Sequence, residues 1–177
     1  AHLDALMMTD HFDNHDYQDI LITLQENYPA SSEHFFDIEG VHLYPGMEVE
    51  TREGSHILLN GTLSAVQTFY QRIKPHTTEA NYLAAADILA LAHDFDLLCI
   101  YAHPFRPKRE ISNIPTHLIS AFDALDINGK DLWRFGTQHL HTVTDFATQH
   151  HLPAVGGSDA HHYLQVGVIS NKLSAPC

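Results

Sequence analysis

The stretch LPAVGGSDAH, residues 152–161, places two potential metal ligands directly after a short apolar run. Residues 153–155 are predicted to form a strand, and Asp159 and His161 follow it two positions apart, so extended backbone would point both side chains the same way. Carboxylate and imidazole groups bind divalent zinc, manganese or iron. Taken alone, the Ser-Asp-Ala-His sequence fits a metal site or a hydrogen-bonded loop equally well.

Four other stretches also offer an imidazole or a carboxylate where a short apolar run ends or follows: Thr9-Asp10-His11, Gly46-Met47-Glu48, Gly54-Ser55-His56 and Ala102-His103-Pro104. A lone histidine after a strand is usually a hydrogen-bonded loop residue. Five such groups at successive strand ends indicate a metal centre, because ligands gather at the carboxyl ends of strands in parallel sheets. The side chains predicted to converge are His11, Glu48, His56, His103, Asp159 and His161. Asp10 is expected to brace neighbouring ligands through a hydrogen bond.

The rest of the sequence alternates short apolar runs with helical patterns. Strands are expected at residues 3–8, 47–50, 57–59, 97–101, 124–127, 153–155 and 166–169, and helices at 17–27, 63–73, 79–93, 115–121 and 130–151. This alternation predicts an α/β fold with a largely parallel sheet covered by helices. No linker or low-complexity tract interrupts it, so residues 1–177 are expected to form a single domain.

Composition narrows the class of protein. The formal net charge is −13 and only nine residues are Lys or Arg, which argues against a nucleic-acid polymer as partner. No apolar stretch reaches about 18 residues, so no membrane span is expected. No signal peptide is visible, which favours a cytoplasmic protein. Cys99 lies in an apolar run and is expected to be a buried thiol, and two cysteines are too few for a disulfide framework.

Several stretches match the motifs of one family in the correct order. Residues 3–11, LDALMMTDH, are similar to a strand that ends in Thr-Asp-His, and GMEVE at 46–50 precedes HIL at 56–58. AHPFR at 102–106 and LPAVGGSDAH at 152–161 complete the series. The chain thus resembles the PHP (polymerase and histidinol phosphatase) family of metal-dependent phosphoesterases over nearly its whole length. The resemblance implies a distorted (β/α)7 TIM-like barrel.

One motif of that family is missing. The family opens with a strand that ends in His-x-His, and no such motif precedes His11. Residues 1–3 are expected to be the end of the first helix, so the first strand–helix unit is absent. A barrel built from units of about 30 residues needs roughly 210 for seven units and roughly 180 for six, which fits this length. The sequence is either a fragment or a naturally shortened form.

The absent unit has a structural consequence. It would leave unpaired strand edges beside residues 3–10 and 166–169, which predicts either a homodimer across the gap or a longer polypeptide. His139-Leu140-His141 cannot replace the missing motif, because residues two apart on the helix predicted there point about 200° apart.

The resemblance also implies a reaction. The expected activity is hydrolysis of a small phosphate monoester or nucleotide by a metal-activated water, with up to three divalent ions (Zn, Mn or Fe). Glu48, His103 and Asp159 would be the catalytic residues, and Arg106 would either grip the substrate phosphate or form a salt bridge.

The metal ligands follow from the same resemblance. Glu48 would bridge two ions, and His56 and His103 would bind one of them. Asp159 would serve the ion that the missing histidines should hold. His11 and His161 would bind the third ion.

Two other classes of function stay open. The chain could be a degenerate PHP module that binds metal without catalysis. It could also be an amidohydrolase-like enzyme that cleaves C–N bonds, although that reading favours a bridging carboxylated lysine or glutamate. None of Lys74, Lys108 and Lys172 ends a predicted strand.

Overall fold

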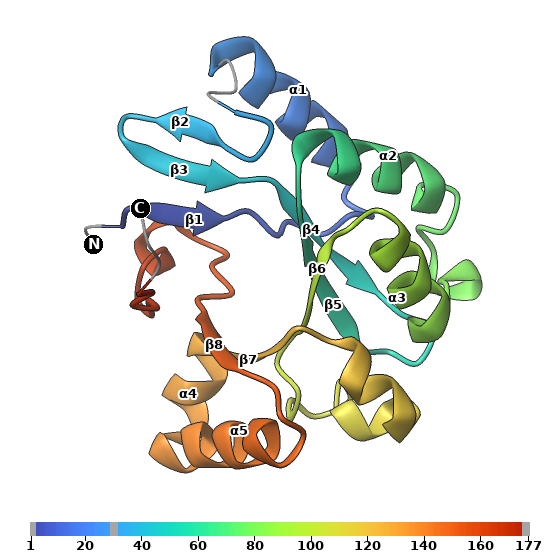
Figure 1. Ribbon diagram of the computed structural model, residues 1–177, viewed down its shortest axis with the longest axis vertical. Coiled ribbons are helices and arrows are strands. Elements are labelled where there is room, and N and C mark those ends of the chain that lie inside the picture. The colour runs from blue at the N-terminus through green and yellow to red at the C-terminus, as the bar shows by residue number, and fades with distance from the viewer. Residues whose placement is uncertain (1–2, 29–31, 175–177) are drawn as a thin grey trace.

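The computed structural model describes residues 3–28 and 32–174, and their strands form two sheets (Figure 1). The three-stranded sheet has the order β1-β3-β2 and the five-stranded sheet has the order β4-β5-β6-β7-β8. The strands are β1 (Ala5–Met7), β2 (Phe36–Ile38), β3 (Val41–Tyr44), β4 (Gly46–Glu50), β5 (His56–Asn60), β6 (Leu98–Tyr101), β7 (Ala124–Asn128) and β8 (Ala154–Gly157). The predicted α/β class is therefore confirmed.

The sheets are mixed rather than largely parallel. Strand β4 pairs antiparallel with β5, and β5 pairs antiparallel with β6, whereas β6, β7 and β8 run parallel. In the smaller sheet, β1 is parallel to β3 and β2 is antiparallel to it. Short connections join β2 to β3 and β4 to β5, and such connections can only reverse the chain. Strands β5 and β6 are antiparallel across a longer segment that contains α2 and α3.

The two sheets are connected where β3 continues into β4. Strand β3 leads into β4 through Pro45, and the segment after β1 follows β4 in parallel. There the amide of Glu48 donates to the carbonyl of Asp10 at 2.9 Å, and the amide of Phe12 donates to the carbonyl of Glu48 at 3.0 Å. This crossing brings His11 beside Glu48.

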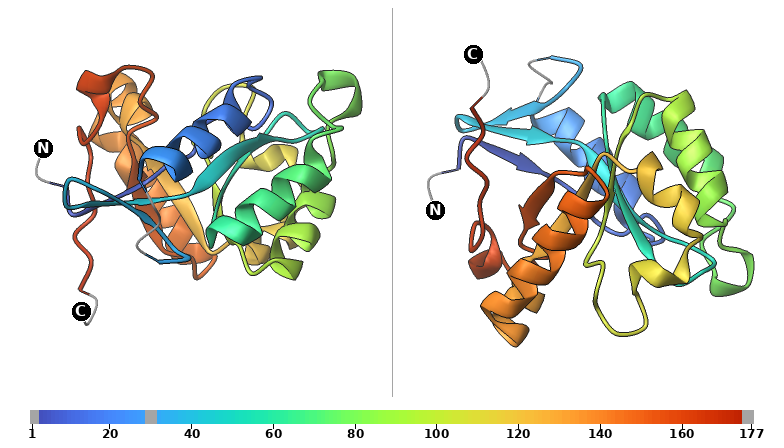
Figure 2. Two further views of the ribbon diagram at one scale, coloured as in Figure 1. Left: turned by 90° about the horizontal axis from the view of Figure 1, so that it is seen from above. Right: turned by 60° about the horizontal axis from the view of Figure 1, so that its bottom comes forward.

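The expected closed barrel is not confirmed. The described strands leave both sheets open, with β1 at one edge of its sheet and β8 at one edge of the other (Figures 1 and 2). The predicted strand at residues 166–169 is wrong, because that segment forms turns, with Gly167 at a φ of 76°. The edge of β8 is instead capped by Asn171, whose side-chain amide both accepts from the Gly156 amide and donates to the Gly156 carbonyl.

In the described part of the chain, five α-helices cover the strands. They are α1 (Tyr17–Asn27), α2 (Leu63–Ile73), α3 (Ala85–Asp94), α4 (Gly129–Phe135) and α5 (Thr137–Gln149). Short 3₁₀ helices lie at η1 (Glu79–Asn81), η2 (Ile111–Asn113), η3 (Thr116–Ala121) and η4 (Tyr163–Gln165). The first two α-helices have the predicted bounds. The helix predicted at 130–151 is split at Gly136, whose φ of 70° does not fit an α-helix, and the helix predicted at 79–93 becomes a 3₁₀ turn followed by α3.

The core positions the polar face of β4. Met47 and Val49 are buried in the same apolar cluster as Val66 and Phe69 of α2. Because side chains alternate along a strand, Glu48 and Glu50 lie on the face opposite to Met47 and Val49.

Among the described residues, no helix is long and apolar enough to cross a membrane. The predicted end of a helix at residues 1–2 lies outside the described residues.

Candidate metal centre

Glu48 lies at the middle of a cluster of histidines. Its side chain is buried in β4, and its Oε1 lies 2.5 Å from Nδ1 of His56 and 3.3 Å from Nε2 of His103. Its Oε2 lies 3.4 Å from Nε2 of His11. The two oxygens of one carboxylate therefore face different histidines.

Strand pairing explains how His56 reaches Glu48. In the antiparallel register of β4 and β5, His56 is directly opposite Glu50, and Glu48 is the next residue on the same face of β4. Diagonal neighbours of this kind are within reach of long side chains. The imidazole of His56 is thus placed between two carboxylates.

His103 enters the cluster from the end of β6. Its Nε2 lies 3.2 Å from Nδ1 of His56, and its backbone amide donates to Oδ2 of Asp126 at 3.3 Å. Its φ of 35° is unusual for a residue with a side chain. Strained backbone of this type is concentrated at functional sites, where surrounding contacts hold it in place.

These side chains fit a divalent cation. His11, Glu48 and His56 each offer one ligand atom, and these atoms lie within 4.8 Å of one another. Imidazole and carboxylate are suitable donors for zinc, manganese or iron. Nε2 of His56 and Nδ1 of His103 are buried and have no hydrogen-bond partner among the described residues. Polar atoms buried in this way are uncommon and need an explanation.

The electrostatics keep the donors in forms that can bind a cation. Burial opposes ionisation of Glu48, but hydrogen bonds from His103 and His56 outweigh it and hold the pKa of this carboxyl well below its usual range. Burial lowers the pKa of His103, with the positive charge of Arg106 acting in the same direction. A carboxylate and a neutral imidazole are the protonation states that metal binding requires.

Asp159 and His161 form a second group beside the first. Asp159 follows β8 with a φ of 50°, and its Oδ2 accepts from Nη2 of Arg106 at 2.8 Å. His161 is exposed, and its Nδ1 lies 2.9 Å from the backbone oxygen of Asp159. Within the described residues, no hydrogen bond or ion pair joins either side chain to Glu48. The structure thus brings four of the six expected ligands into contact, whereas Asp159 bonds to Arg106 and Asn128.

Arg106 is held by three side chains. Its Nε donates to the carboxylate of Asp131 at 3.0 Å, and its Nη2 donates to Oδ1 of Asn128 at 2.8 Å as well as to Asp159. Asn128 also caps α4, because its Oδ1 accepts from two backbone amides of that helix. The salt bridge that was one of the two expectations for Arg106 is therefore present.

Sequence reasoning missed the residues that tie these groups together. Asp126 accepts from the amides of His103 and Gly157 and from Asn128 Nδ2. Polar residues at alternate positions at the end of an otherwise apolar strand were the available signal. Asp10, expected to brace the ligands, does so only through its backbone carbonyl. The carboxylate nearest to Nδ1 of His11 belongs to Asp13, at 4.0 Å.

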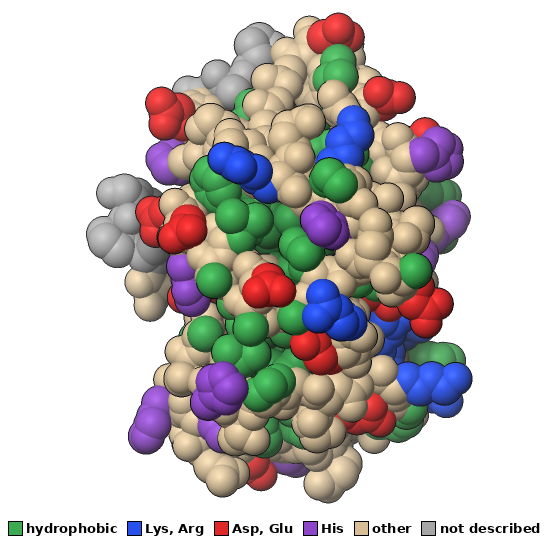
Figure 3. Space-filling model, turned by 90° about the vertical axis from the view of Figure 1, so that its right-hand side faces the viewer, with side chains coloured by type: hydrophobic (Ala, Val, Ile, Leu, Met, Phe, Trp, Pro, Cys, Tyr) green, Lys and Arg blue, Asp and Glu red, His purple; other side chains and the backbone are tan. Residues whose placement is uncertain are grey.

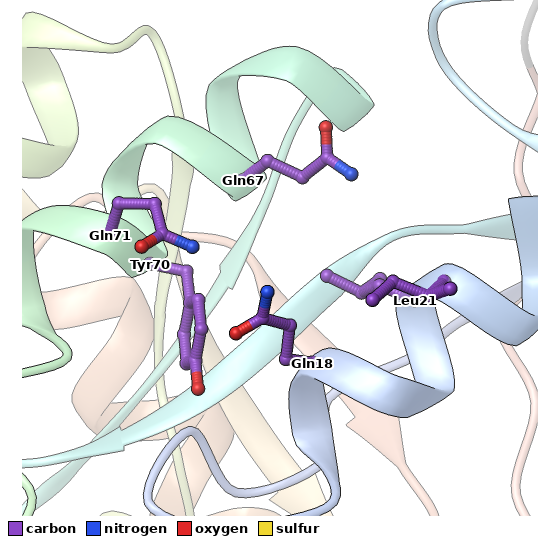
Figure 4. Close-up of a pocket in the computed structure, with 6 residues that line it drawn as sticks. Gln18, Leu21, Gln67, Tyr70 and Gln71 are labelled. Atoms are coloured by element: carbon purple, nitrogen blue, oxygen red, sulfur yellow. The ribbon is translucent and has the colours of Figure 1, made fainter.

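Two surface features lie outside the cluster. A cavity of about 240 Å³ between α1 and α2 shares no residue with the cluster (Figure 4), and its lining consists of Gln18, Leu21, Ile22, Gln67, Tyr70 and Gln71. On the face shown in Figure 3, lysine and arginine side chains lie among acidic, histidine and hydrophobic side chains. Neither feature adds a ligand to the candidate metal centre.

The comparisons with known proteins give a family match and a shared fold. Residues 138–176 match a family model described as PHP-associated. The sequence has no match among the curated proteins. The structure is similar to PsfC from Pseudomonas syringae PB-5123, with a TM-score of 0.72 and 22% identity over 94% of this chain and 65% of PsfC.

Two further structures share this fold. The lesion-specific endonuclease EndoQ from Pyrococcus furiosus has a TM-score of 0.67 and 24% identity, over 90% of this chain and 40% of EndoQ. A two-domain protein from Bacteroides vulgatus that contains a predicted PHP-like metal-dependent phosphoesterase has a TM-score of 0.58 and 14% identity, over 93% and 45% of the two chains. This chain therefore spans 65% of PsfC and less than half of the other two proteins.

One expectation is overturned by these neighbours. A structure of Endonuclease Q in complex with a 27-mer duplex substrate, with an abasic lesion at the active site, has the same fold at a TM-score of 0.62. The prediction that a nucleic-acid polymer is excluded as a partner is therefore wrong. It was drawn from net charge, which sums the whole surface and does not describe the local potential around a site.

Proposed function

Because the carboxy-terminal match and the shared fold support membership of the PHP family, we propose that this chain is a metal-dependent phosphoesterase whose cation is bound around Glu48. The observation that carries the proposal is the convergence of ligand atoms from His11, Glu48 and His56 within 4.8 Å, with His103 in contact with the last two. Zinc, manganese and iron all suit this donor set.

The cation and the side chains of the protein would contribute different parts of the chemistry. A bound divalent cation would supply Lewis acidity and lower the pKa of a water molecule beside it. Glu48 would contribute the negative charge that holds the cation, and its two oxygens face His56 and His11 respectively. This arrangement supports the proposal that Glu48 would hold a cation together with the histidines on either side of its carboxylate.

Arg106 is proposed to bind the substrate phosphate. Its Nε and Nη2 atoms donate to Asp131, Asn128 and Asp159, whereas Nη1 makes no hydrogen bond among the described residues. The free edge of the guanidinium could donate to a phosphate oxygen. The substrate would be a phosphate ester, either a small monoester or nucleotide or a nucleic-acid duplex, the class of substrate that is bound in the Endonuclease Q complex.

The experiment compares the purified chain with its Glu48→Gln variant. Glu26→Gln, an exposed site on α1, is the matched control for loss of one carboxylate. We expect Glu48→Gln to bind zinc at least about tenfold more weakly and to lose hydrolysis, and the control to keep both. Elemental analysis and zinc titration measure binding. Assays with p-nitrophenyl phosphate, bis(p-nitrophenyl) phosphate and a DNA duplex separate the substrate classes.

One observation favours a second candidate function. Because Asp159 and His161 make no hydrogen bond or ion pair with the other four ligands among the described residues, we also consider a module that binds metal without catalysis. Zinc binding that depends on Glu48, without hydrolysis of any of the three substrates, would favour this module. Equal zinc binding by the chain and by Glu48→Gln would contradict both functions.

For the C–N hydrolase alternative, no lysine among the described residues forms a hydrogen bond or ion pair with the four clustered side chains.

A further inference from the structure

His56 is placed between two glutamates that differ in how closely they approach. Its Nδ1 lies 2.5 Å from Oε1 of Glu48, and its Nε2 lies 3.6 Å from Oε2 of Glu50. The antiparallel register sets this arrangement, because Glu50 is the residue directly opposite His56. Only the Glu48 side is at hydrogen-bonding distance.

The second nitrogen of His56 is unpartnered. Nε2 is buried and makes no hydrogen bond among the described residues. A buried polar atom left in this state costs about 1–3 kcal/mol. A neutral imidazole carries one proton, so when Nδ1 donates to Glu48, Nε2 is a bare acceptor facing another acceptor. In that tautomer no hydrogen bond joins Nε2 to Glu50.

Glu50 is itself held from the opposite side. Nη1 of Arg109 forms an ion pair with Oε1 of Glu50 and donates to the carbonyl of Gly54 at 3.0 Å. The backbone of Arg109 is fixed in turn, because its carbonyl accepts from the hydroxyl of Tyr101 at 3.1 Å. The carboxylate of Glu50 therefore keeps Oε2 directed at His56.

We propose that Glu50 is a positioning residue for the metal ligand His56, and that Arg109 acts by holding Glu50. The inference rests on the proposed function. When a cation takes the lone pair of Nδ1, the single proton of the ring resides on Nε2. Nε2–H then donates to Oε2 of Glu50, which needs only to move closer by less than about 1 Å. A carboxylate behind a ligating histidine fixes its tautomer and typically strengthens metal binding by about 10–100-fold.

The test measures zinc affinity and the protonated nitrogen of His56. ¹⁵N NMR of the full chain distinguishes Nδ1–H from Nε2–H, with zinc as the probe and a His56→Gln spectrum for assignment. In the unsubstituted chain we expect the proton on Nδ1 without zinc and on Nε2 with zinc. Glu50→Gln is expected to bind zinc at least about tenfold more weakly, and the Nε2–H signal should change. Glu26→Gln should leave both unchanged.

A second variant tests the role of Arg109. Arg109→Met should weaken zinc binding by a smaller factor than Glu50→Gln. The double variant should be no weaker than Glu50→Gln alone, because Arg109 acts only through Glu50. Circular dichroism checks that each variant is folded, and if Glu50→Gln does not fold, unchanged affinity in Arg109→Met overturns the proposal.

The two proposals fail in different ways. Wild-type affinity and an unchanged His56 spectrum in Glu50→Gln would overturn the role of Glu50 while leaving the metal site intact. Absence of zinc binding by the unsubstituted chain would overturn the proposed function, and this inference with it.

Discussion

His103 and Asp159 have left-handed backbone, with φ values of 35° and 50°, just after β6 and β8 respectively. Non-glycine residues avoid this region because of clashes between the side chain and the backbone, at a cost of about 1–3 kcal/mol. Contacts with neighbours oppose that cost: the amide of His103 donates to Asp126, and Asp159 accepts from Arg106. At the scale of single residues, strain and polar contacts therefore coincide where the strands end.

Cys99 provides a prediction at the same scale. Burial, with the negative charge of Asp123 as a second cause, raises the pKa of this thiol to about 12. Near pH 8 its thiolate fraction is roughly a thousandfold below that of a free cysteine. In a Cys177→Ser variant, where Cys99 is the remaining thiol, we expect modification by a thiol reagent to proceed only as fast as the chain unfolds. Rapid labelling of the folded chain would contradict this.

The same pKa shift predicts a dependence on pH. The folded state keeps the Cys99 proton to a higher pH than the unfolded state, whose thiol ionises near pH 8.5. The contribution to the free energy of unfolding is therefore complete below about pH 8.5 and is lost as the pH rises towards 12. Cys99→Ala should show a shallower alkaline decline in urea unfolding experiments.

The start of β4 shows how one residue can constrain an element. Gly46 is not among the residues with positive φ, so the chain does not need a glycine here for a turn. What it provides is space, because a Cβ at this position would overlap the backbone carbonyl oxygen of Leu59 in the paired strand β5. The carbonyl of Gly46 also accepts from the buried hydroxyl of Tyr17 in α1 at 2.9 Å. Strand, neighbouring strand and helix thus meet at a position without a side chain.

This close approach predicts the effect of an added methyl group. Gly46→Ala should lower the free energy of unfolding by about 2–3 kcal/mol, because the clashing atom belongs to the backbone. Gly61→Ala is the matched control, since its Cβ would clash only with Cδ2 at the tip of the Leu97 side chain, which can move. We expect a loss below about 1 kcal/mol there. Urea unfolding measures both, and equal losses would refute the distinction.

For the molecule as a whole, two open sheets share one crossing, and helices cover the five-stranded sheet (Figure 2). The candidate centre collects side chains from the segment after β1, from β4, from β5 and from the loop after β6. Asp126 connects this region to the far edge of the sheet, because its buried carboxylate accepts from His103 and from Gly157. The second group, with Asp159, is thereby fixed relative to the first.

The connecting role of Asp126 can be tested by truncation. Asp126→Ala leaves the amides of His103 and Gly157 and the amide group of Asn128 without their acceptor. We expect the free energy of unfolding to fall by at least about 3 kcal/mol. Asp123→Ala removes a single hydrogen bond, from the amide of Cys99, and should cost about 1 kcal/mol. Similar losses in the two variants would contradict a connecting role.

Local pattern was enough to predict much of the chain. The spacing of apolar residues predicts α1 and α2 with their observed bounds, and each apolar run from 47–50 to 153–155 lies at a strand. It fails at the hairpin of β2 and β3, which turns through Glu39 at a φ of 52°, and at Gly136, which divides α4 from α5. Hydrophobic periodicity indicates which residues of a helix or strand are buried. A turn involves only a few residues, so it produces little periodic signal in the sequence.

The candidate site was also predictable from the sequence only in part. The residue types and their positions after apolar runs indicate His11, Glu48, His56 and His103 from the sequence by itself, because ligand chemistry is a property of the side chain. Tertiary structure alone decided that these four meet while Asp159 bonds to Arg106, and that Glu50 stands opposite His56. Those relations depend on strand direction and register, which are set by pairing between segments far apart in the chain and cannot be read from any one segment.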